Sequence, residues 1–360
     1  MTGAGHGQPA AHVRAALEAD RPSWDRFVIS RLEGDPLQTW AWGEVNAKFG
    51  ERPLRLVAER GATLVGVAQL LIRDVGRGLT VGYVPHGPLW RRDDPDGANL
   101  LSLLLDGLRQ AARRERAIVV KVDPRAARSE DEHARLAAAL ADAGLRRARF
   151  DLQAVTTRIV DLTGDEAAIW GRWEPDGRTR VRRARREGVS THVDRTGEPA
   201  AVATLAALHE ATAERASFRG RPAAFLADVA AAFVPQSAWL AVEARYGGAA
   251  VAAMGFLRVG DRAFYLWGGS TRDPGVTAAR APYAVLGEAI ESLAADGCRS
   301  LDLWGVIEAT DEATHPDAAG YSRFKRKFGG VPLRHPGTFD LIVNPAWYRL
   351  RDLRERLLQR

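Results

Sequence analysis

Alternating apolar positions, separated by glycine-containing turns, predict a small mixed sheet in the first half of the chain. Two runs, residues 54–59 and 63–72, flank Arg60-Gly61 and predict a β-hairpin. Helical periodicity follows twice, and the second helix ends at Gly144, a residue type that favours helix termination. The further elements that the pattern predicts are strands over 79–83, 118–122, 147–153 and 156–162, and helices over 99–116 and 129–143.

The second half of the chain repeats this order. Residue 249 corresponds to residue 63 and residue 300 to residue 118, offsets of 186 and 182 residues. A shared order this long indicates a duplicated unit. The predicted elements are strands over 239–244, 249–258, 262–267, 300–303, 331–334 and 338–343, and helices over 283–296 and 317–328. Preceding helices are predicted over 38–49 in the first unit, and over 202–216 and 223–233 in the second.

The repeated order resembles that of GNAT-type acyltransferase domains, a likeness of fold that says little about chemistry. We therefore predict an α/β (α+β) fold of two tandem GNAT-like domains, each a mixed, mostly antiparallel sheet flanked by helices. The first domain is expected over residues 1–163 and the second over 164–343. Residues 344–360 predict a basic amphipathic C-terminal helix that packs on the first domain.

Composition narrows the class of protein. The 360 residues are 46% hydrophobic and 27% charged, which excludes global disorder. No apolar stretch approaches the roughly 20 residues needed to cross a bilayer, and the first ten residues lack the features of a signal peptide. We therefore expect a cytoplasmic monomer. Its one cysteine, Cys298, excludes an internal disulfide, and the eight histidines lack ligand spacing, so no metal is expected.

Charge adds one useful contrast. The net charge of +6 permits a polyanionic partner without requiring one. Only four of the 51 basic residues are lysines, namely Lys48, Lys121, Lys325 and Lys327. In so arginine-rich a chain, a retained lysine is either a compact ammonium that the chemistry needs or a solvated surface cation.

Two catalytic signatures are incomplete. His209-Glu210 begins like a zinc-protease helix, but Ala213 stands where the second histidine is required. Residues 73–78 fit the R-x-x-G-x-G pattern with which acetyltransferases hold the pyrophosphate of acetyl-CoA. That loop must open a helix, because helix N-terminal N–H groups bind the phosphates. Here a strand is predicted to follow, so the sequence favours a hairpin turn and disfavours CoA as donor.

Several short sequence motifs, here called phrases, occur in a fixed order along the chain. Each phrase alone is a weak signal, but their shared order is more informative. The phrases are Gln38-Thr39-Trp40-Ala41-Trp42-Gly43, Tyr83-Val84-Pro85-His86-Gly87-Pro88, Lys121-Val122-Asp123-Pro124, the basic run 178–188, Thr212-Ala213-Glu214-Arg215, Trp267-Gly268-Gly269-Ser270, Ala281-Pro282-Tyr283, Asp302-Leu303-Trp304-Gly305 and Phe324-Lys325-Arg326-Lys327-Phe328-Gly329-Gly330. Over residues 36–343 they resemble the Fem family (FemABX) of non-ribosomal peptidyltransferases, in the compact form without a coiled-coil arm.

This resemblance implies an aminoacyltransferase. Its members move an amino acid from aminoacyl-tRNA to an amine on the peptide stem of a peptidoglycan precursor. An aminoacyl ester is already activated, so no cofactor is expected. The enzyme must align the amine with the ester, help the amine lose its proton and stabilise the oxyanion. Any membrane contact would be peripheral, through a lipid-linked precursor.

Two residues are candidates for catalysis. Lys325 matches the lysine of the family's F-K-x-x-F-G-G phrase, which implies that it stabilises the oxyanion or holds the tRNA 3′ end. The alternative is a snorkelling surface lysine. Asp123 follows a strand and precedes a proline, where a carboxylate can accept the amine's proton or cap the turn, and both interpretations remain open.

The resemblance also implies a pocket for the acceptor. Arg215 matches the arginine that contacts the sugar-nucleotide part of the precursor, and Lys48 lies near the position of a phosphate-binding lysine, which here is Asn46. Arg219 stands where the family often has an aromatic ring. These two departures keep open an acceptor other than peptidoglycan, such as a natural-product amine. The aromatic residues assigned to substrate binding are Tyr265, Trp267 and Tyr283.

The basic run has two interpretations. A solvated helix face is the usual one, whereas the resemblance implies contacts with tRNA phosphates, which depend on salt. The residues assigned to tRNA are Arg180, Arg182, Arg183, Arg186 and Lys327.

Overall fold

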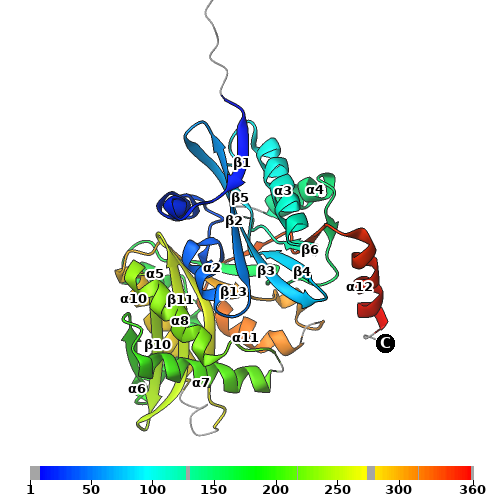
Figure 1. The fold of residues 1–360 in the computed structure, drawn as a ribbon. Helices are drawn as coiled ribbons and strands as arrows, with labels where there is room; N and C mark the ends of the chain where they lie inside the picture. The colour runs from blue at the N-terminus through cyan, green and yellow to red at the C-terminus, as the bar shows by residue number, and fades with distance from the viewer. Residues whose placement is uncertain (1–8, 127–129, 217, 274–279, 315, 358–360) are drawn as a thin grey trace, which may run out of the picture. The chain divides into compact units, whose positions relative to one another are not determined.

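The computed structural model describes residues 9–126, 130–216, 218–273, 280–314 and 316–357. The chain divides into two compact units (Figure 1). Unit 1 comprises residues 1–153 and 335–360, and unit 2 comprises residues 154–334. Among the described residues, no helix is both long enough and apolar enough to span a bilayer.

Unit 1 is built on one mixed sheet with the strand order β1-β2-β3-β4-β6-β15-β7, and β5 pairs with β3. Among the described residues of this sheet, only the β4–β6 ladder is parallel; the other ladders are antiparallel. The strands are β1 (Ala11–Ala15), β2 (Arg52–Arg60), β3 (Thr63–Gly76), β4 (Leu79–Val84), β5 (Leu89–Trp90), β6 (Ala117–Val122), β7 (Arg146–Arg147) and β15 (Phe339–Ile342).

Leucines at helical spacing attach α3 (Gly97–Arg114) to this sheet. Leu100, Leu104 and Leu108 recur every four residues and are fully buried against the sheet. The helix α4 (Glu130–Asp142) contributes Leu140 to the same core. The remaining helices of unit 1 are α1 (Arg21–Ser30), α2 (Trp40–Ala47) and α12 (Pro345–Leu357), whose Trp347 and Tyr348 pack on Leu79, Val81, Ile118 and Val119.

Unit 2 has a sheet of the order β14-β8-β13-β12-β11-β10-β9. Again one ladder of the described residues, β12–β13, is parallel. The strands are β8 (Thr156–Asp161), β9 (Ser190–Asp194), β10 (Trp239–Tyr246), β11 (Ala249–Val259), β12 (Arg262–Ser270), β13 (Ser300–Gly305) and β14 (Val331–Arg334).

Helices cover both faces of this sheet, as the alternation along β11 requires. Met254 and Phe256 belong to the core that α10 completes, whereas a side chain on Gly255 between them would meet Leu205 of α7. The helices are α5 (Glu166–Gly171), α6 (Pro175–Arg186), α7 (Pro199–Arg215), α8 (Ala223–Phe233), α10 (Ala281–Ala295) and α11 (Pro316–Arg326).

Apart from β5, the two sheets correspond strand for strand, which confirms the predicted fold class of two similar units. The expected boundaries were wrong in one respect. The strand β8, expected to close the first unit, pairs with β13 and β14 of unit 2. The strand β15, expected to close the second unit, pairs with β6 and β7 of unit 1. The chain therefore exchanges these strands, and it passes between the units at residues 153–154 and 334–335 rather than after residue 163.

Local predictions were otherwise close, with one exception. The expected strand over 147–153 ends at Arg147. Beyond this strand, side-chain oxygens accept hydrogen bonds from backbone N–H groups. Thr338 Oγ1 accepts from the Leu152 N–H at 2.9 Å, and Asp151 accepts from the Thr338 N–H at 2.7 Å. At residues 73–78, β3 and β4 form the hairpin that the sequence favoured over a phosphate-binding loop.

The paired glycines after α11 have a steric reason. Gly329 and Gly330 adopt φ angles of 75° and 79°, the left-handed region that side chains disfavour. A Cβ on Gly330 would also lie 2.5 Å from the Ile159 carbonyl oxygen. The glycine therefore lets the chain turn from α11 into β14 beside β8.

We predict that Gly330→Ala destabilises unit 2 by about 1–3 kcal/mol, because strained backbone and a backbone clash add. Gly320→Ala is the matched control, since Gly320 lies in α11 with open space around its Cα. It should be neutral or stabilising by up to about 1 kcal/mol. Urea unfolding of both variants checks this, and equal effects would contradict the steric explanation.

Candidate active site

Lys325 is buried in unit 2, which excludes the surface-lysine alternative. It lies on α11, one residue after Phe324, and only 8% of it is exposed. Its Nζ donates to the Gly305 carbonyl oxygen at 2.8 Å. The same Nζ lies 5.1 Å from the ring centre of Tyr265 and 5.2 Å from that of Tyr321. An ammonium between two aromatic faces is stabilised by their negative π-electron density.

Burial also makes this lysine a weaker base. Removal from water lowers the pKa of Lys325 to about 7, and the carboxylate of Asp302 opposes that shift. Asp302 is itself buried and held in place by the Trp304 N–H, at 2.7 Å, and by the Thr157 hydroxyl. At neutral pH the ammonium of Lys325 is therefore only partly populated and poorly hydrated.

The backbone of β13 creates the acceptor for Lys325. The parallel ladder with β12 ends at the pair Phe264 and Asp302, although β13 continues to Gly305. Trp304, in between, has a φ of 58°, which turns the strand end. The Gly305 carbonyl, beyond the ladder, accepts from the lysine.

The aromatic residues assigned to substrate binding divide into two groups. Tyr283 packs on Phe324, with ring centres 4.9 Å apart, and Phe324 precedes the lysine. Burial raises the pKa of both Tyr265 and Tyr283, so both remain neutral phenols. Trp267 instead is buried beside Trp239 and serves the core of the unit.

Arg215 is the last residue of α7 and Arg219 lies in the segment that follows, and both are exposed. The guanidinium of Arg215 donates to the Ser270 carbonyl at 2.6 Å and to Thr212 Oγ1 at 2.9 Å. It therefore joins the end of α7 to the end of β12, which places its charge in a defined position.

The basic residues on and near α6 are not equivalent. Arg180 is paired with Asp176 at 2.9 Å, and Lys327 with Glu174 at 2.8 Å. Arg183 is likewise paired with Glu187. Arg182 and Arg186 are exposed, and within the described chain neither forms an ion pair; the Arg182 guanidinium lies over the Trp170 ring at 5.2 Å. The structure thus reduces the predicted cationic face to these two arginines.

In unit 1 the structure corrects one assignment. Asn46 is 1% exposed, and its amide donates to the Trp42 carbonyl one helical turn earlier, at 2.7 Å. This side chain completes α2 and is not presented to a ligand. Lys48, two residues later, is exposed.

Asp123 is the centre of a buried polar network in unit 1. One carboxylate oxygen accepts from the Tyr83 hydroxyl at 2.8 Å, and the other accepts from the His86 N–H at 2.7 Å. Burial raises the pKa of Asp123 to about 6. The His86 ring contacts Asp35, which also receives Arg125 at 3.4 Å. Both oxygens are therefore engaged within the unit, by groups distant in the chain rather than by the turn that follows Asp123.

Comparison with known protein families identifies the family of this chain. The model of the FemAB family matches residues 20–245, and that of an acetyltransferase (GNAT) domain matches residues 175–326. The chain belongs to the FemAB family. The Fem resemblance of the sequence is thereby confirmed.

Relatives of this FemAB-family protein include the lipid II:glycine glycyltransferases of Staphylococcus saprophyticus and of Staphylococcus aureus strain RF122. The first is 28% identical over 59% of this chain and 51% of its own length, and the second 27% identical over 57% and 49%. The chain thus spans about half the length of the curated relatives it matches. Its fold is that of the FemX crystal structure, at a TM-score of 0.80 and 18% identity over 94% of this chain and 99% of the other.

Several residues around Lys325 escaped the sequence analysis. Tyr321 lies one helical turn before the lysine, and that spacing was the available signal. Asp302 lay in a quoted phrase without an assigned role. Thr157 had no signal, because it lies on the exchanged strand β8.

We predict that Lys325 makes the stability of this FemAB-family protein depend on pH. The unfolded chain holds the lysine's proton up to a pKa near 10.5, whereas the folded chain releases it near 7. Stability therefore rises with pH between these values, by at most about 4–5 kcal/mol. Lys325→Met should lack this rise and be more stable than the wild type below pH 7.

Urea unfolding of both proteins below pH 7 and above pH 10 provides the measurement. The difference in free energy of unfolding should shrink as the pH rises. A constant difference would mean that the buried lysine has an ordinary pKa.

Proposed function

We propose that this FemAB-family protein is an aminoacyltransferase that moves an amino acid from aminoacyl-tRNA to an amine of a peptidoglycan precursor. Family membership and the glycyltransferase names of its relatives support a transferase of this class. The observation that carries the proposal is the buried ammonium of Lys325 at the end of a parallel strand pair. A site of this kind fits acyl transfer from an activated ester without a cofactor.

The proposed step is direct aminolysis. The acceptor amine attacks the ester carbonyl, the new C–N bond forms, and the C–O bond to the tRNA 3′ end breaks. The amine loses a proton, and the leaving 3′-oxygen gains one. Negative charge develops on the carbonyl oxygen in the transition state, and a preorganised cation stabilises it most where water is excluded.

Lys325 is suited to this role by its remaining donors. An ammonium has three N–H groups, and the Gly305 carbonyl takes one of them. The aromatic rings of Tyr265 and Tyr321 exclude water from the group without neutralising it. We propose that the other two donors meet the oxyanion.

We propose a positioning role for Asp123 rather than direct proton transfer. Its carboxylate joins the end of β6 to the turn at His86, through the Tyr83 hydroxyl and the His86 N–H. The loss of this carboxylate would release a turn that the family phrase includes. Arg182 and Arg186 are proposed to contact tRNA phosphates, and Arg215, Arg219 and Lys48 the acceptor.

A second acceptor class is retained on one observation. Arg219 is exposed where the family often has an aromatic ring, which favours a differently shaped acceptor such as a natural-product amine. The same donor chemistry would apply. Asn46, the other departure from the family pattern, uses its amide within α2.

The function is tested by offering purified protein a mixture of charged tRNAs with radiolabelled amino acids. Parallel reactions contain a nucleotide-linked muropeptide, a lipid-linked muropeptide or a set of small amines. We expect one labelled amino acid to appear in a muropeptide. Transfer only to a small amine would support the second acceptor class, and acyl transfer from CoA instead of tRNA would overturn the proposal.

We predict that Lys325→Met lowers kcat by roughly 10²–10³-fold, the range for losing one oxyanion donor. The KM for tRNA should change far less, because the interaction is made mainly in the transition state. Lys325→Arg should restore little, since a guanidinium fork does not occupy the position of a compact ammonium. Single-turnover assays at two salt concentrations provide the measurement.

Arg323→Met is the matched control, because Arg323 is exposed on the same helix and its replacement also removes a basic side chain. It should leave kcat within a fewfold of the wild type. If Lys325→Arg restores the rate, or if Arg323→Met loses as much, the lysine acts by diffuse attraction for RNA and is not catalytic.

We predict that Arg182→Gln combined with Arg186→Gln weakens tRNA binding and lowers the slope of log affinity against log salt by about 2, one for each phosphate contact. The matched pair Arg180→Gln with Arg183→Gln removes the same charge from arginines that carboxylates already hold. Its effect should be smaller. Filter binding at several salt concentrations measures both, and equal losses would point to the net charge of the helix alone.

A further inference from the structure

The strand β13 has a bulge just before the carbonyl that Lys325 uses. Its residues Asp302 and Gly305 both pair with β8. Two residues of β13 stand between them, whereas the facing segment of β8 has only Arg158. A bulge of this kind bends the strand and changes the direction of the groups that follow it. The position of the Gly305 carbonyl, and with it the contact to Lys325, therefore depends on the bulge.

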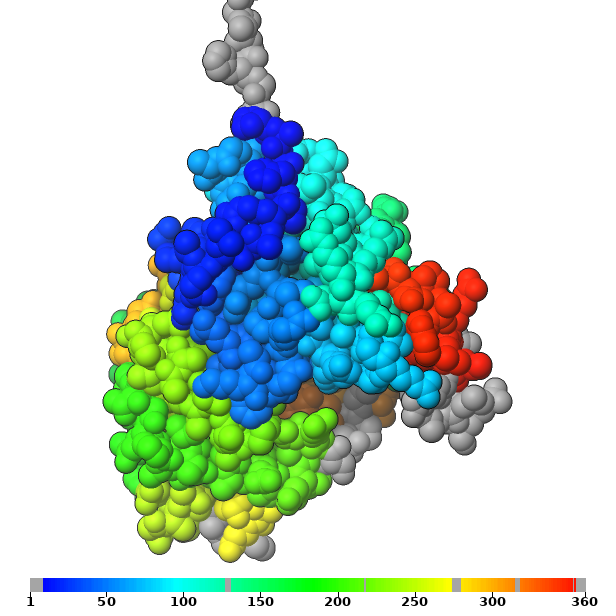
Figure 2. Space-filling model, in the orientation of Figure 1, coloured from blue at the N-terminus to red at the C-terminus, as the bar shows by residue number. Residues whose placement is uncertain are grey.

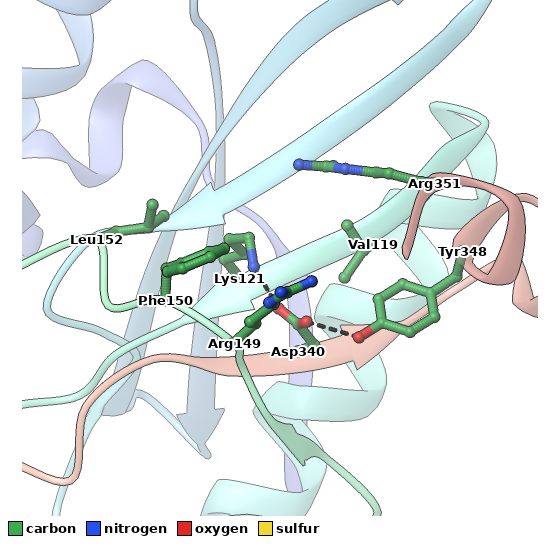
Figure 3. A pocket seen from close by; sticks show the side chains of 8 residues that line it. All are labelled: Val119, Lys121, Arg149, Phe150, Leu152, Asp340, Tyr348 and Arg351. Carbon is green, nitrogen blue, oxygen red and sulfur yellow. Dashed lines mark hydrogen bonds and ion pairs between the residues drawn. The ribbon is translucent and has the colours of Figure 1, made fainter. Parts of the chain in front are cut away.

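The corresponding ladder of unit 1 has no bulge among its described pairs. There β6 pairs with β15 in a constant register. Two residues of this ladder, Lys121 and Asp340, form an ion pair at 2.7 Å, and the Tyr348 hydroxyl donates to Asp340 at 2.8 Å (Figure 3). The bulge is therefore a feature of unit 2 and not a requirement of the shared fold.

Two side chains contact the backbone of the bulged residue, Trp304, whose φ is 58°. Its N–H donates to Asp302 Oδ1 at 2.7 Å, and its carbonyl accepts from the Thr157 hydroxyl at 3.1 Å. The same hydroxyl contacts Asp302 Oδ1. We name Asp302 and Thr157 the Trp304 clamp. It gives partners to buried N–H and C=O groups that are costly to leave without them.

Both members of the Trp304 clamp are buried, with 3% of each residue exposed. Asp302 stands between Leu301 and Leu303, which belong to the core that α10 completes, so its side chain lies on the opposite face of the sheet. The helix α7 packs on that face at β11 and β12. In the space-filling view, α7 and α8 (green) form the near surface of unit 2 (Figure 2). Because water is largely excluded, the hydrogen bonds of the clamp hold a defined geometry.

The segment after the bulge also fixes the helix that carries the lysine. The Ile307 N–H donates to Ser322 Oγ at 3.0 Å, and the Ile307 carbonyl accepts from Arg326 at 2.8 Å. Ser322 and Arg326 lie on α11, one turn before Lys325 and next to it. The same short segment thus holds α11 in place and supplies the Gly305 carbonyl to the lysine.

We propose that Asp302 and Thr157 are positioning residues for Lys325. The clamp fixes the bulge, and the bulge directs the Gly305 carbonyl to the ammonium. This contact aims the remaining N–H groups of the lysine at the reacting ester, and a preorganised donor stabilises a transition state more than a mobile one does. The inference rests on the proposed function, since it assigns both residues to the oxyanion step.

Asp302 also acts through its charge. Among the described residues, the titratable groups that face the ammonium are Asp302 of β13, Tyr265 of β12 and Tyr321 of α11. Burial raises the pKa of both tyrosines, so they stay neutral. The Asp302 carboxylate favours the protonated form of Lys325. Asp302→Asn keeps an acceptor oxygen for the clamp but removes this charge, which lowers the pKa of Lys325 further.

Lysine-selective ¹³C labelling tests the coupling without any transfer assay. The chain has four lysines, and Lys325→Met assigns the NMR signal of Lys325. In a pH titration, Asp302→Asn should move the transition of this signal to lower pH. Asp194→Asn is the matched control, because it removes a buried carboxylate from β9, at the far edge of the same sheet. It should leave the transition in place.

The hydroxyl of the clamp is tested by Thr157→Val, which keeps the branched shape of the side chain. It should change the Lys325 signal and lower kcat roughly fivefold, about the contribution of one hydrogen bond, with little change in the KM for tRNA. Thr157→Ser retains the hydroxyl and should restore both. Thr156→Val is the matched control on the adjacent residue of β8, whose hydroxyl makes no hydrogen bond within the described chain. It should behave like the wild type.

Combination with Lys325→Met separates positioning from a general structural effect. Alone, Asp302→Asn should lower kcat at pH 7 roughly three- to tenfold and move the fall of kcat with rising pH to lower pH. In the absence of the lysine, neither Asp302→Asn nor Thr157→Val should lower kcat further, because residues that act through one group are not additive. Thermal unfolding checks the fold of each variant, and if Asp302→Asn does not fold, the Thr157 variants decide.

The inference is overturned if the Lys325 signal and its transition are unchanged in both clamp variants. It is equally overturned if the clamp variants lose as much kcat without Lys325 as with it, or if the control variants match the clamp variants. A wild type without transfer activity would refute the proposed function instead. The NMR titration would then still decide whether the clamp holds the lysine, so the two failures are distinguishable.

Discussion

The burial of one ammonium group constrains the architecture of unit 2. Lys325 requires a carbonyl acceptor, aromatic faces and a nearby carboxylate, because a buried cation without partners would lose its proton or unfold its surroundings. The turned end of β13 supplies Gly305, the strand interior supplies Asp302, and α11 supplies Tyr321 and the lysine itself. The glycines after α11 let the chain leave this helix directly into β14.

The two units share a fold but differ in charge at corresponding places. Within the described residues, each unit has one parallel strand pair, β4–β6 in unit 1 and β12–β13 in unit 2. Where each pair ends, backbone N–H and C=O groups need hydrogen-bond partners. Unit 2 meets this need with a cation, Lys325. Unit 1 meets it with an anion, Asp123, which receives the His86 N–H. The two similar units thus hold buried polar groups of opposite sign near the ends of their parallel strand pairs.

Because β8 and β15 are exchanged, each sheet contains one strand that the sequence repeat assigns to the other unit. Thr157 of β8 holds Asp302, so a residue from before the second repeat helps to position the carboxylate near Lys325. In unit 1, Asp340 of β15 forms an ion pair with Lys121 of β6, 219 residues away in the chain. Both polar sites therefore depend on the exchange.

The sequence by itself indicated most elements of the two repeats, their order and the family, because periodicity, turn residues and short phrases are local. It also singled out Lys325, because this lysine matches the F-K-x-x-F-G-G phrase of the family that the sequence resembles. It did not predict β1, α1, β5, α5 or β9. Only the tertiary structure decided which strands pair, because the partners of β8 and β15 lie far from them in the chain. Only the tertiary structure decided that Asn46 is buried, and that Arg180 and Arg183 are paired while Arg182 and Arg186 are not. Burial and charge pairing depend on neighbours distant in the chain, and no local pattern contains them.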